Sequence, residues 1–420
     1  MKRLDQRMKQ TFTIGLLLLA NFVFAATIIV GKDQLVTSLK KGIELARDGD
    51  TVILQKGIYK EGNIVINKSI RLIGINEPVL DGENKYEILT VSGERILIKG
   101  IHFRNSGYSS MNDFASISLV DARYCMIENN IIEHSYFAIH VANASNCVIV
   151  ENKIKGTPKT EQTSGNAIHL WKCDSMVVES NDVQGHRDGI YFEFVTHSYI
   201  YQNHSHNNIR YGLHFMFSNN DSYMENVFTE NGAGVAVMYS HHVLMHSNSF
   251  KLNWGPNSYG LLLKEISDAQ IMNNQFDRNT AAIDMESTNR IEVQSNNFQN
   301  NGWALRISAS CNENAIHHNN FSANTFDVAT NGTMMLNEFY NNYWDKYDGY
   351  DMNKDGIGDV AYHPVSMYSM VIEQNPNSLL LLRSFMVSLL DKAEKAIPSL
   401  TPENLIDAQP LMRRKNYDQD

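Results

Sequence analysis

Short runs that alternate apolar and polar residues recur along most of this chain. Such alternation is typical of strands that bury one face. The runs share one register, in which two inward apolar residues flank one outward residue. The apolar pairs are Ile139/Val141, Ile168/Leu170, Ile190/Phe192, Leu213/Phe215, Val235/Val237, Leu261/Leu263, Ile283/Met285 and Leu305/Ile307. Each run covers only a few residues, so the pattern predicts many short strands rather than a few long ones.

Asparagine marks one point of each repeat, and an apolar residue usually follows two positions later. These phrases occupy positions 129–131, 152–154, 181–183, 203–205, 226–228, 248–250, 274–276, 296–298, 319–321 and 337–339. A spacing of about 22 residues leaves room for three short strands and three turns. We expect the asparagine at a left-handed turn position, where its amide can bond nearby backbone or the asparagines of adjacent coils.

Stacked coils of this length would bury a continuous apolar column that no single coil could bury alone. The sequence therefore predicts an all-β fold, a right-handed parallel β-helix of the pectin-lyase type. Counting the asparagine phrases gives roughly ten coils.

The chain divides into five predicted segments. They are a signal peptide at 1–25, a cap with the first coils at 26–75, the repeats at 76–342, an Asp-rich region closing the solenoid at 343–377, and a helix with a tail at 378–420. In the cap, 35–46 has helical spacing, and 51–54, 63–66 and 69–73 look like strands. Near the other end, 378–395 predicts one helix that Pro398 and Pro402 terminate.

The N-terminus has the parts of a secretory signal. Lys2, Arg3, Arg7 and Lys9 precede an apolar run at 11–24, and Val23 and Ala25 are the small residues of a cleavage site. The run is short for a membrane span, although an uncleaved anchor is the alternative. We expect a mature periplasmic protein that starts near Ala26 and is peripheral to the membrane.

Composition narrows the classes of molecule that the chain could bind. The formal net charge is −10 and no long basic run occurs, which argues against a nucleic-acid partner. The four cysteines, Cys125, Cys147, Cys173 and Cys311, lack CxxC spacing. They allow three disulfide connectivities, or they are small buried apolar residues.

Outward positions of the strands are where a β-helix must carry its binding groups. His214, Met216 and Met238 fall on neighbouring coils, roughly one strand spacing of 4.8 Å apart. Imidazole and thioether groups suit Cu(I), so these residues predict an exposed, transient copper site. Weaker candidates are His241, His242, Met245 and His246, and Met224, His204 and His206 add to the local density. The alternative is that these residues form a partner interface or pack under loops.

An acidic loop offers a second metal site. Its residues match positions 1, 3, 5, 7 and 9 of a calcium loop, with Gly356 at position 6; they are Asp351, Asn353, Asp355, Ile357 and Asp359. The twelfth position is Tyr362 rather than Glu, so the bidentate ligand is missing. We expect structural calcium here, and an Asp/Gly turn without metal is the alternative.

Two carboxylates keep an enzyme hypothesis open. Asp188 and Glu193 lie near Trp171 in the register, and a glycosidase needs two carboxyl groups across its sugar. A carbohydrate-active enzyme, such as a polysaccharide lyase or glycosidase, or a sugar-binding protein is therefore the alternative to a non-enzymic role. Nothing in the sequence fixes the distance between the two carboxylates.

Several phrases resemble the NosD family. They are RDGIYFEF at 187–194, NIRYGLHFMFS at 208–218, NYWD at 342–345, the acidic loop at 351–359, and YHP at 362–364. The resemblance covers essentially the whole mature chain. It implies a periplasmic β-helical accessory protein for maturation of the copper centre of nitrous oxide reductase.

The resemblance also implies partners. NosD-like proteins work with an ABC-type transporter, formed by a permease and its ATPase, and a copper-chaperone lipoprotein supplies metal. On that reading the chain receives and presents Cu(I) and is not an enzyme. The apolar helix at 378–390 would then contact the permease at the membrane, unless it only caps the last coil. Whether copper, sulfur or only conformational work passes through the protein stays open.

Overall fold

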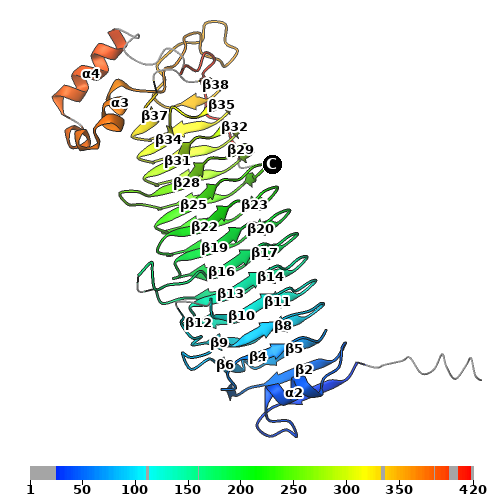
Figure 1. Cartoon of the computed structure of the whole chain (residues 1–420). Helices are drawn as coiled ribbons and strands as arrows, with labels where there is room; N and C mark the ends of the chain where they lie inside the picture. The colour runs from blue at the N-terminus through cyan, green and yellow to red at the C-terminus, as the bar shows by residue number, and fades with distance from the viewer. Residues whose placement is uncertain are drawn as a thin grey trace, which may run out of the picture.

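The computed structural model describes residues 25–109, 113–158, 160–332, 336–382, 384–396 and 405–417. The predicted signal peptide lies outside these residues except for Ala25. The described chain forms one long solenoid of parallel strands with helices at both ends (Figure 1). The predicted right-handed parallel β-helix is confirmed.

Three parallel sheets run the length of the solenoid, and each coil contributes one strand to each sheet. Sheet A has 14 strands in the described chain. They are β1 (Thr27–Val30), β2 (Thr51–Gln55), β5 (Arg71–Ile75), β8 (Leu97–Lys99), β11 (Met126–Glu128), β14 (Val148–Val150), β17 (Val177–Glu179), β20 (Tyr199–Tyr201), β23 (Ser222–Met224), β26 (Leu244–His246), β29 (Ser267–Met272), β32 (Asn289–Gln294), β35 (Asn312–His317) and β38 (Leu336–Tyr340).

Sheet B follows sheet A in each coil and has 13 strands among the described residues. They are β3 (Ile58–Tyr59), β6 (Val79–Asp81), β9 (His102–Arg104), β12 (Ile131–Glu133), β15 (Lys153–Lys155), β18 (Asp182–Gln184), β21 (His204–His206), β24 (Val227–Thr229), β27 (Ser249–Lys251), β30 (Gln275–Asp277), β33 (Asn297–Gln299), β36 (Asn320–Ser322) and β39 (Tyr343–Trp344).

Sheet C completes the coil, with 12 strands in the part of the chain that is described. They are β4 (Ile64–Ile66), β7 (Leu89–Val91), β10 (Ala115–Val120), β13 (Phe137–Ala142), β16 (Ile168–Trp171), β19 (Asp188–Glu193), β22 (Tyr211–Met216), β25 (Ala233–Met238), β28 (Tyr259–Lys264), β31 (Ala281–Glu286), β34 (Trp303–Ile307) and β37 (Phe326–Thr330). The register predicted from alternation is confirmed, since Ile190 pairs with Leu213 and Phe192 with Phe215.

The solenoid has about 14 turns, so the prediction of roughly ten coils is wrong. The count relied on asparagine, and the first coils lack it. At the point where later coils carry asparagine, just before the sheet B strand, the early coils have Gly57, Pro78 and Ile101. Ile101 still donates its backbone N–H to Asn130, 3.1 Å away, so the column continues without a break.

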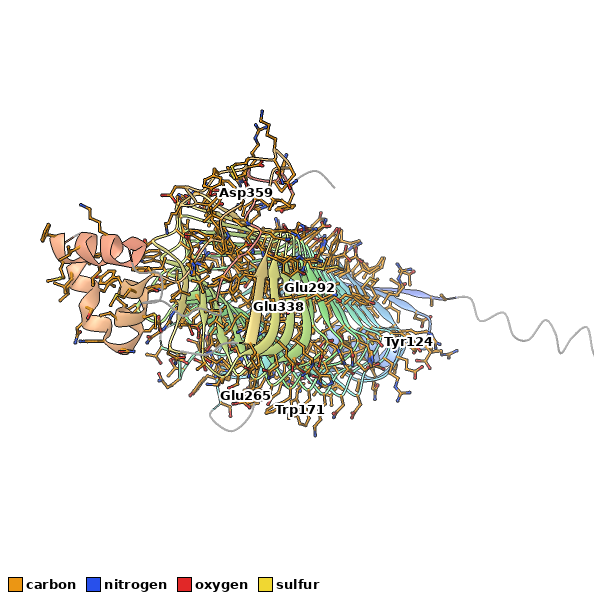
Figure 2. The ribbon with its side chains drawn as sticks, turned by 90° about the horizontal axis from the view of Figure 1, so that it is seen from above. Tyr124, Trp171, Glu265, Glu292, Glu338 and Asp359 are labelled. Atoms are coloured by element: carbon orange, nitrogen blue, oxygen red, sulfur yellow. The ribbon has the colours of Figure 1, made fainter. Side chains whose placement is uncertain are left out.

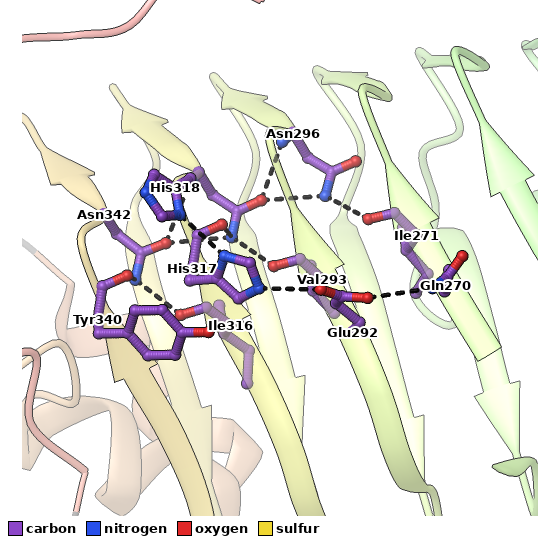
Figure 3. Close-up of polar contacts among 11 residues, drawn as sticks. Gln270, Ile271, Glu292, Val293, Asn296, Ile316, His317, His318, Tyr340 and Asn342 are labelled. Atoms are coloured by element: carbon purple, nitrogen blue, oxygen red, sulfur yellow. Dashed lines mark hydrogen bonds and ion pairs between the residues drawn. The ribbon is translucent and has the colours of Figure 1, made fainter. Parts of the chain in front are cut away.

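A buried asparagine ladder joins the coils that follow. Each member accepts from the backbone N–H and the amide of the coil before it and donates to main-chain carbonyls. Figure 3 shows this at Asn296 and Asn342, whose amides donate to the carbonyls of Ile271 and Ile316 at 2.9 Å. The members are Asn130, Asn152, Asn181, Asn203, Asn226, Asn248, Asn274, Asn296, Asn319 and Asn342. The predicted bonding between coils is confirmed.

Three details of the asparagine prediction are wrong. The ladder begins at Asn130, because Asn129 is the left-handed residue before it, with φ 50°. In general the left-handed position belongs to the residue preceding the ladder asparagine, such as Glu225 at φ 54°. The ladder ends at Asn342, since Asn337 belongs to a shorter parallel ladder with Asn314.

The core is aliphatic in the early coils and aromatic in the late ones. Sheet B contributes a stack of buried rings with centroids 4.1 to 5.5 Å apart. The rings belong to Phe228, Phe250, Phe276, Phe298, Phe321 and Trp344. Flat rings repeated at strand spacing fill the interior and keep the coils in register.

Both ends differ from the predictions in helix boundaries. The N-terminal cap contains α2 (Leu39–Leu45), shorter than the predicted 35–46, with the Ser38 hydroxyl accepting from Lys41 at its start. The single helix predicted at 378–395 is wrong. The chain instead forms α3 (Met367–Gln374), a 3₁₀ segment η1 (Pro376–Leu381) and α4 (Phe385–Ala396).

The C-terminal tail returns to the solenoid. Asp407 is fully buried and accepts from the amide of Asn342 at 3.1 Å and from the indole N–H of Trp344 at 3.0 Å. Further on, Lys415 and Asn320 exchange backbone-to-amide hydrogen bonds. The tail therefore ends the asparagine ladder and covers the last coil.

Candidate functional site

The outward face of sheet C carries a column of stacked rings in its middle coils. Tyr191 lies between His169, at 4.7 Å between ring centroids, and His214, at 4.6 Å. These three residues face one another directly in the strand register of β16, β19 and β22. His140 extends the column by one coil, 5.1 Å from His169. Burial lowers the pKa of His140 to about 4.

His214 is outward in register but not exposed, so the prediction of an exposed histidine is wrong. Only 5% of its surface is accessible, because Tyr191 covers one side of the ring and Tyr211 lies 4.9 Å away. Neither ring nitrogen has a hydrogen-bond partner, and the nearest acid is Asp188, 3.7 Å from Nδ1. Buried polar atoms are normally paired, so these nitrogens are unusual.

Two thioethers lie beside this column. Met216 of β22 pairs in register with Met238 of β25, and both side chains are half-buried on the outward face. The Tyr191 hydroxyl donates to the Met216 sulfur at 3.5 Å. Burial raises the pKa of Tyr191 to about 12, so this hydroxyl stays protonated at neutral pH. The structure thus brings Met216 and Met238 together as expected, with His214 beneath them. Copper binding at this face stays a prediction.

The two carboxylates of the enzyme hypothesis have different surroundings. Asp188 has no exposed surface and forms a two-pronged ion pair with Arg210. Burial raises its pKa, but the Arg210 guanidinium and the nearby His214 imidazole outweigh that effect and lower it to about 2. Glu193 is half-buried, and the imidazole of His169 holds its pKa below the usual value against the opposing effect of burial. Neither carboxyl has the raised pKa that a general acid needs.

The weaker copper candidates lie elsewhere. His241 and His242 are exposed in the turn between β25 and β26, with ring centroids 5.1 Å apart. Met245 is fully buried in the core, because alternation in β26 turns Leu244 and His246 outward; its placement among surface ligands is wrong. His246 is half-buried and its Nε2 already pairs with the Asn273 amide at 3.1 Å.

Sequence reasoning missed one partner of His246. Strand pairing places Met224 of β23 on one side of it and Met272 of β29 on the other. The sequence signal for this partner was the alternation of inward and outward residues, which would have to be followed along sheet A as it was along sheet C. The chain therefore has a second soft-donor set on another face.

Aromatic residues border the Met216/Met238 pair, two of them exposed and Tyr239 half-buried. Phe194, Phe217 and Tyr239 stack at centroid distances of 5.2 and 4.9 Å along the corner that follows sheet C. We call these three residues the aromatic corner. The same left-handed position holds Asn143, Lys172, Glu265 and Ser287 in other coils. Trp171 and Glu265 lie on this side of the solenoid in Figure 2. Because polar residues serve equally well there, the fold does not require the aromatic rings.

The acidic loop lies near the C-terminal end, with Asp359 on the opposite side of the view from Trp171 (Figure 2). Its side chains bond its own backbone. Asp351 accepts from the N–H groups of Lys354 at 2.6 Å and Gly356 at 2.9 Å. Asp359 accepts from Met352 at 2.7 Å. Gly356 has φ +87°, as a tight turn requires. These contacts build the turn, and calcium binding at 351–359 stays a prediction.

All four cysteines are buried and free of disulfide bonds. Cys125 and Cys147 occupy the same column in successive coils, where the Cys147 sulfur accepts from the Cys125 backbone N–H at 3.3 Å. They therefore act as small core residues, one of the two expectations from the sequence.

The helical segment at the C-terminal end packs on sheet C and leaves an apolar surface. Phe326, Tyr368, Ile372 and Val387 form its small core, and Arg306 pairs with Glu373 through two 3.0 Å bonds. Its outer surface exposes a continuous set of large apolar side chains, which we call the apolar end. They are Leu379, Leu380, Leu381, Leu382, Phe385, Met386 and Leu389. Within the described residues, no helix is long and apolar enough to cross a membrane.

One compact group of metal-type ligands occurs on sheet B. Asp182, His204 and His206 form the one set of three or more His, Cys, Asp or Glu residues, among those described, whose ligand atoms all lie within 4.8 Å. The sequence signal was the His-Ser-His phrase, in which two histidines on one strand face the same way. Sequence reasoning noted both histidines but could not see Asp182 beside them.

Comparison with known proteins shows a similarity to the NosD family. A family model described as "Periplasmic copper-binding protein (NosD)" matches residues 150–353. A protein of Pseudomonas aeruginosa named "Probable ABC transporter binding protein NosD" is 28% identical over 392 residues, covering 89% of this chain and 90% of the relative. The chain is therefore similar to NosD proteins along most of its length. The NosD protein of Stutzerimonas stutzeri, with the same printed name, is 25% identical and covers 86% of both chains.

Solved structures support the fold. PfbA, a surface adhesin of Streptococcus pneumoniae, superimposes with a TM-score of 0.52 at 12% identity, over 69% of this chain and 82% of the adhesin. At that identity the likeness concerns architecture alone. The resemblance to NosD that the sequence phrases indicated is confirmed.

Proposed function

We propose that this chain is a periplasmic copper-handling subunit that works with an ABC-type transporter and presents Cu(I) during maturation of the copper centre of nitrous oxide reductase. A single observation carries the proposal. The residues that match the copper-binding family, 150–353, include His169, Tyr191 and His214 of the ring column and the Met216/Met238 pair. A copper-chaperone lipoprotein would deliver the metal and the reductase would receive it.

The donor set of sheet C suits Cu(I). Two thioethers in adjacent coils offer soft ligands, and His214 offers ring nitrogens that no protein group engages within hydrogen-bond distance. Its burial means that a small movement of Tyr191 must precede ligation. A site that needs such a movement binds and releases metal more readily than a closed four-ligand site. That property fits delivery rather than storage.

The sheet A set, Met224, His246 and Met272, is the rival location. We favour sheet C because the ring nitrogens of His214 are unpaired, whereas the Nε2 of His246 is bonded to Asn273. The aromatic corner adds a second reason. Exposed Phe194 and Phe217 beside the methionines provide apolar surface for a protein that exchanges the metal.

The apolar end would dock the subunit on the permease. Leu380 and Phe385 are 89% and 83% exposed, and the patch stands at one extremity of an elongated molecule (Figure 1). It lies on the same sheet C side as the donor set, because α3 packs against β37. A transporter bound there would face the column along which the methionines lie. This arrangement fits a protein that is not an enzyme. The alternative, a carbohydrate-active enzyme, requires a separate test.

Anaerobic Cu(I) titration against a chromophoric chelator tests the donor set. We expect Met216→Leu/Met238→Leu to weaken Cu(I) binding by about 10- to 100-fold, because two thioethers are removed while side-chain volume is kept. The matched control is Met224→Leu/Met272→Leu, which removes two half-buried outward methionines from sheet A. Equal loss in the control, or no loss in the first variant, would reject the sheet C assignment.

Co-purification tests docking. The full-length chain should retain the permease on an affinity column, and Leu380→Ser/Phe385→Ser should lose it while keeping Cu(I) affinity. Ile58→Ser, at a 60% exposed apolar position near the other end, is the control. Retention by the double variant would exclude the apolar end as the contact.

Turnover of an oligosaccharide panel that disappears in Glu193→Gln would instead favour the carbohydrate hypothesis.

A further inference from the structure

A second cluster of ligating side chains lies on sheet B, in the same region of the solenoid but on a different face. Asp182 of β18 pairs in register with His204 of β21. Ser205 points into the core, with no exposed surface, so His204 and His206 both face outward. Their rings stack with centroids 4.2 Å apart and an interplanar angle of 17°.

The carboxylate of Asp182 is placed between the two imidazoles. His206 Nε2 lies 3.3 Å from Asp182 Oδ1, and His204 Nδ1 lies 3.6 Å from Asp182 Oδ2. These separations bring one atom of each side chain to the distances found between ligands that share one ion. His206 is largely covered, while His204 and Asp182 remain accessible to a metal arriving from solvent.

The hydrogen bonds around His206 settle which nitrogen carries its proton. Asn207 donates its amide to Glu230 at 3.2 Å, and a carboxylate can only accept. The other atom of that amide, Oδ1, therefore faces His206 Nδ1 at 2.8 Å, and Nδ1 must be the donor. In a neutral ring, Nε2 then carries a lone pair, which points at the Asp182 carboxylate.

Two acceptors facing each other at 3.3 Å repel unless a cation lies with them. A metal ion bound by both groups would supply that cation. An imidazole whose far nitrogen donates to a fixed acceptor is also the usual outer-sphere arrangement at metal sites. The Glu230–Asn207–His206 chain is such a support.

Neighbouring coils show that the fold does not need these residues. The positions aligned with His204 and His206 hold Asp182 and Gln184 in the preceding coil, Lys153 and Lys155 one coil further back, and Val227 and Thr229 in the following coil. The column therefore accepts any outward residue, and the two histidines with an acid form an isolated group.

We propose that Asp182, His204 and His206 form a binding site for a borderline divalent cation, with Cu²⁺ held more tightly than Zn²⁺. Two imidazoles and a carboxylate without thioether prefer such ions to Cu(I), and affinity for first-row ions peaks at Cu²⁺. Three protein ligands leave a coordination position open for water or an incoming ligand. The site is independent of the Met216/Met238 pair and differs from it in oxidation-state preference.

The test is titration of the untagged mature chain with Cu²⁺ and, separately, Zn²⁺, followed by calorimetry and, for Cu²⁺, electron paramagnetic resonance. We expect one equivalent with two coordinated nitrogens in the wild type. His204→Gln/His206→Gln should lose that equivalent, with binding weakened more than about 100-fold. Asn207→Ala should weaken it about 10-fold by freeing the His206 ring.

The matched control is His102→Gln. His102 lies on sheet B and pairs with Glu133 at 3.1 Å, but it has no second histidine beside it. This variant and Met216→Leu/Met238→Leu should both keep the divalent equivalent. The proposal is overturned if His204→Gln/His206→Gln binds as the wild type does, or if His102→Gln loses as much. Asp182→Asn, at a side chain 48% exposed, provides the same test should the double variant fold poorly.

Discussion

The inward and outward columns of this solenoid follow opposite rules. The inward asparagine ladder keeps one residue type for ten coils from Asn130 to Asn342, with amide contacts of 2.9 to 3.1 Å throughout. The outward column of sheet C changes at every step, from His169 through Tyr191 and His214 to Ala236. One column is uniform and the other is not.

The difference has a physical cause. Each inward asparagine must satisfy the same backbone groups in the absence of water, and few side chains can do so. An outward position has solvent as an alternative partner, so almost any residue is tolerated. A residue type that repeats at inward positions therefore indicates the fold, whereas a cluster of unusual residues at outward positions calls for a functional explanation.

Breaking the ladder should have the largest effect. Asn226→Leu removes an amide that donates to the carbonyls of Ile200 and Met224 and to Asn248. Several buried groups lose their partners at about 1–3 kcal/mol each, so we expect at least about 4 kcal/mol of destabilisation by urea unfolding. Asn257→Leu, at an exposed loop position, should change stability by less than about 0.5 kcal/mol. Similar losses in both variants would erase the distinction between the columns.

The second test concerns the charged pair beneath the outward column. Arg210→Met leaves the fully buried Asp188 without its partner, and we expect a loss of about 3 kcal/mol. Asp188→Asn/Arg210→Met should recover part of it. Because the folded pKa of Asp188 is lowered to about 2, its stabilising contribution is present above pH 4 and lost as the pH falls from about 4 to about 2. Acid unfolding that is unchanged in the double variant would contradict this assignment.

A third test uses the inward position that departs from its column. Burial raises the pKa of Asp221 to about 8, and its Oδ2 has no hydrogen-bond partner. A raised acid pKa means that stability present below about pH 4 is lost as the pH rises toward about 8. Asp221→Asn should therefore stabilise the fold, with an advantage that grows by about 1–3 kcal/mol between pH 5 and pH 8. Asn314 already fills this column in a later coil, so the amide fits. A constant difference across this pH range would show that Asp221 is ionised throughout.

The smallest effect on stability is expected for substitutions at outward positions. Met216→Leu/Met238→Leu should leave the midpoint of thermal unfolding within about 2 °C of the wild type, because leucine keeps the volume of the half-buried side chains. A large drop in that midpoint would mean that the methionines hold the fold, and the Cu(I) result would lose its meaning.

The sequence predicted the fold well where structure depends on repetition. Alternation located the sheet C strands and their register, since inward pairs such as Leu213/Phe215 recur with the coil. It undercounted coils because Gly57, Pro78 and Ile101 replace asparagine early in the chain. It also merged η1 and α4 into one helix, because four consecutive leucines at 379–382 show no periodicity that would locate a break.

The candidate sites were less predictable, since they depend on which residues of different strands meet. Register placed Met216 beside Met238 correctly. It could not show that Tyr191 and Tyr211 would cover His214, because coverage depends on the orientation of each ring. Register pairs Asp182 with His204, but it could not show that the carboxylate lies between His204 and His206, because that depends on the conformation of each side chain.

The return of the tail has a mechanical consequence. The chain leaves the solenoid after Val365, which pairs with Val328, forms α3, η1 and α4, and is anchored again at Asp407. The helices are therefore attached to the solenoid on both sides and do not form a free terminus. A force applied to these helices would be shared between two attachment points, at Val365 and Asp407, instead of acting on the last strand alone.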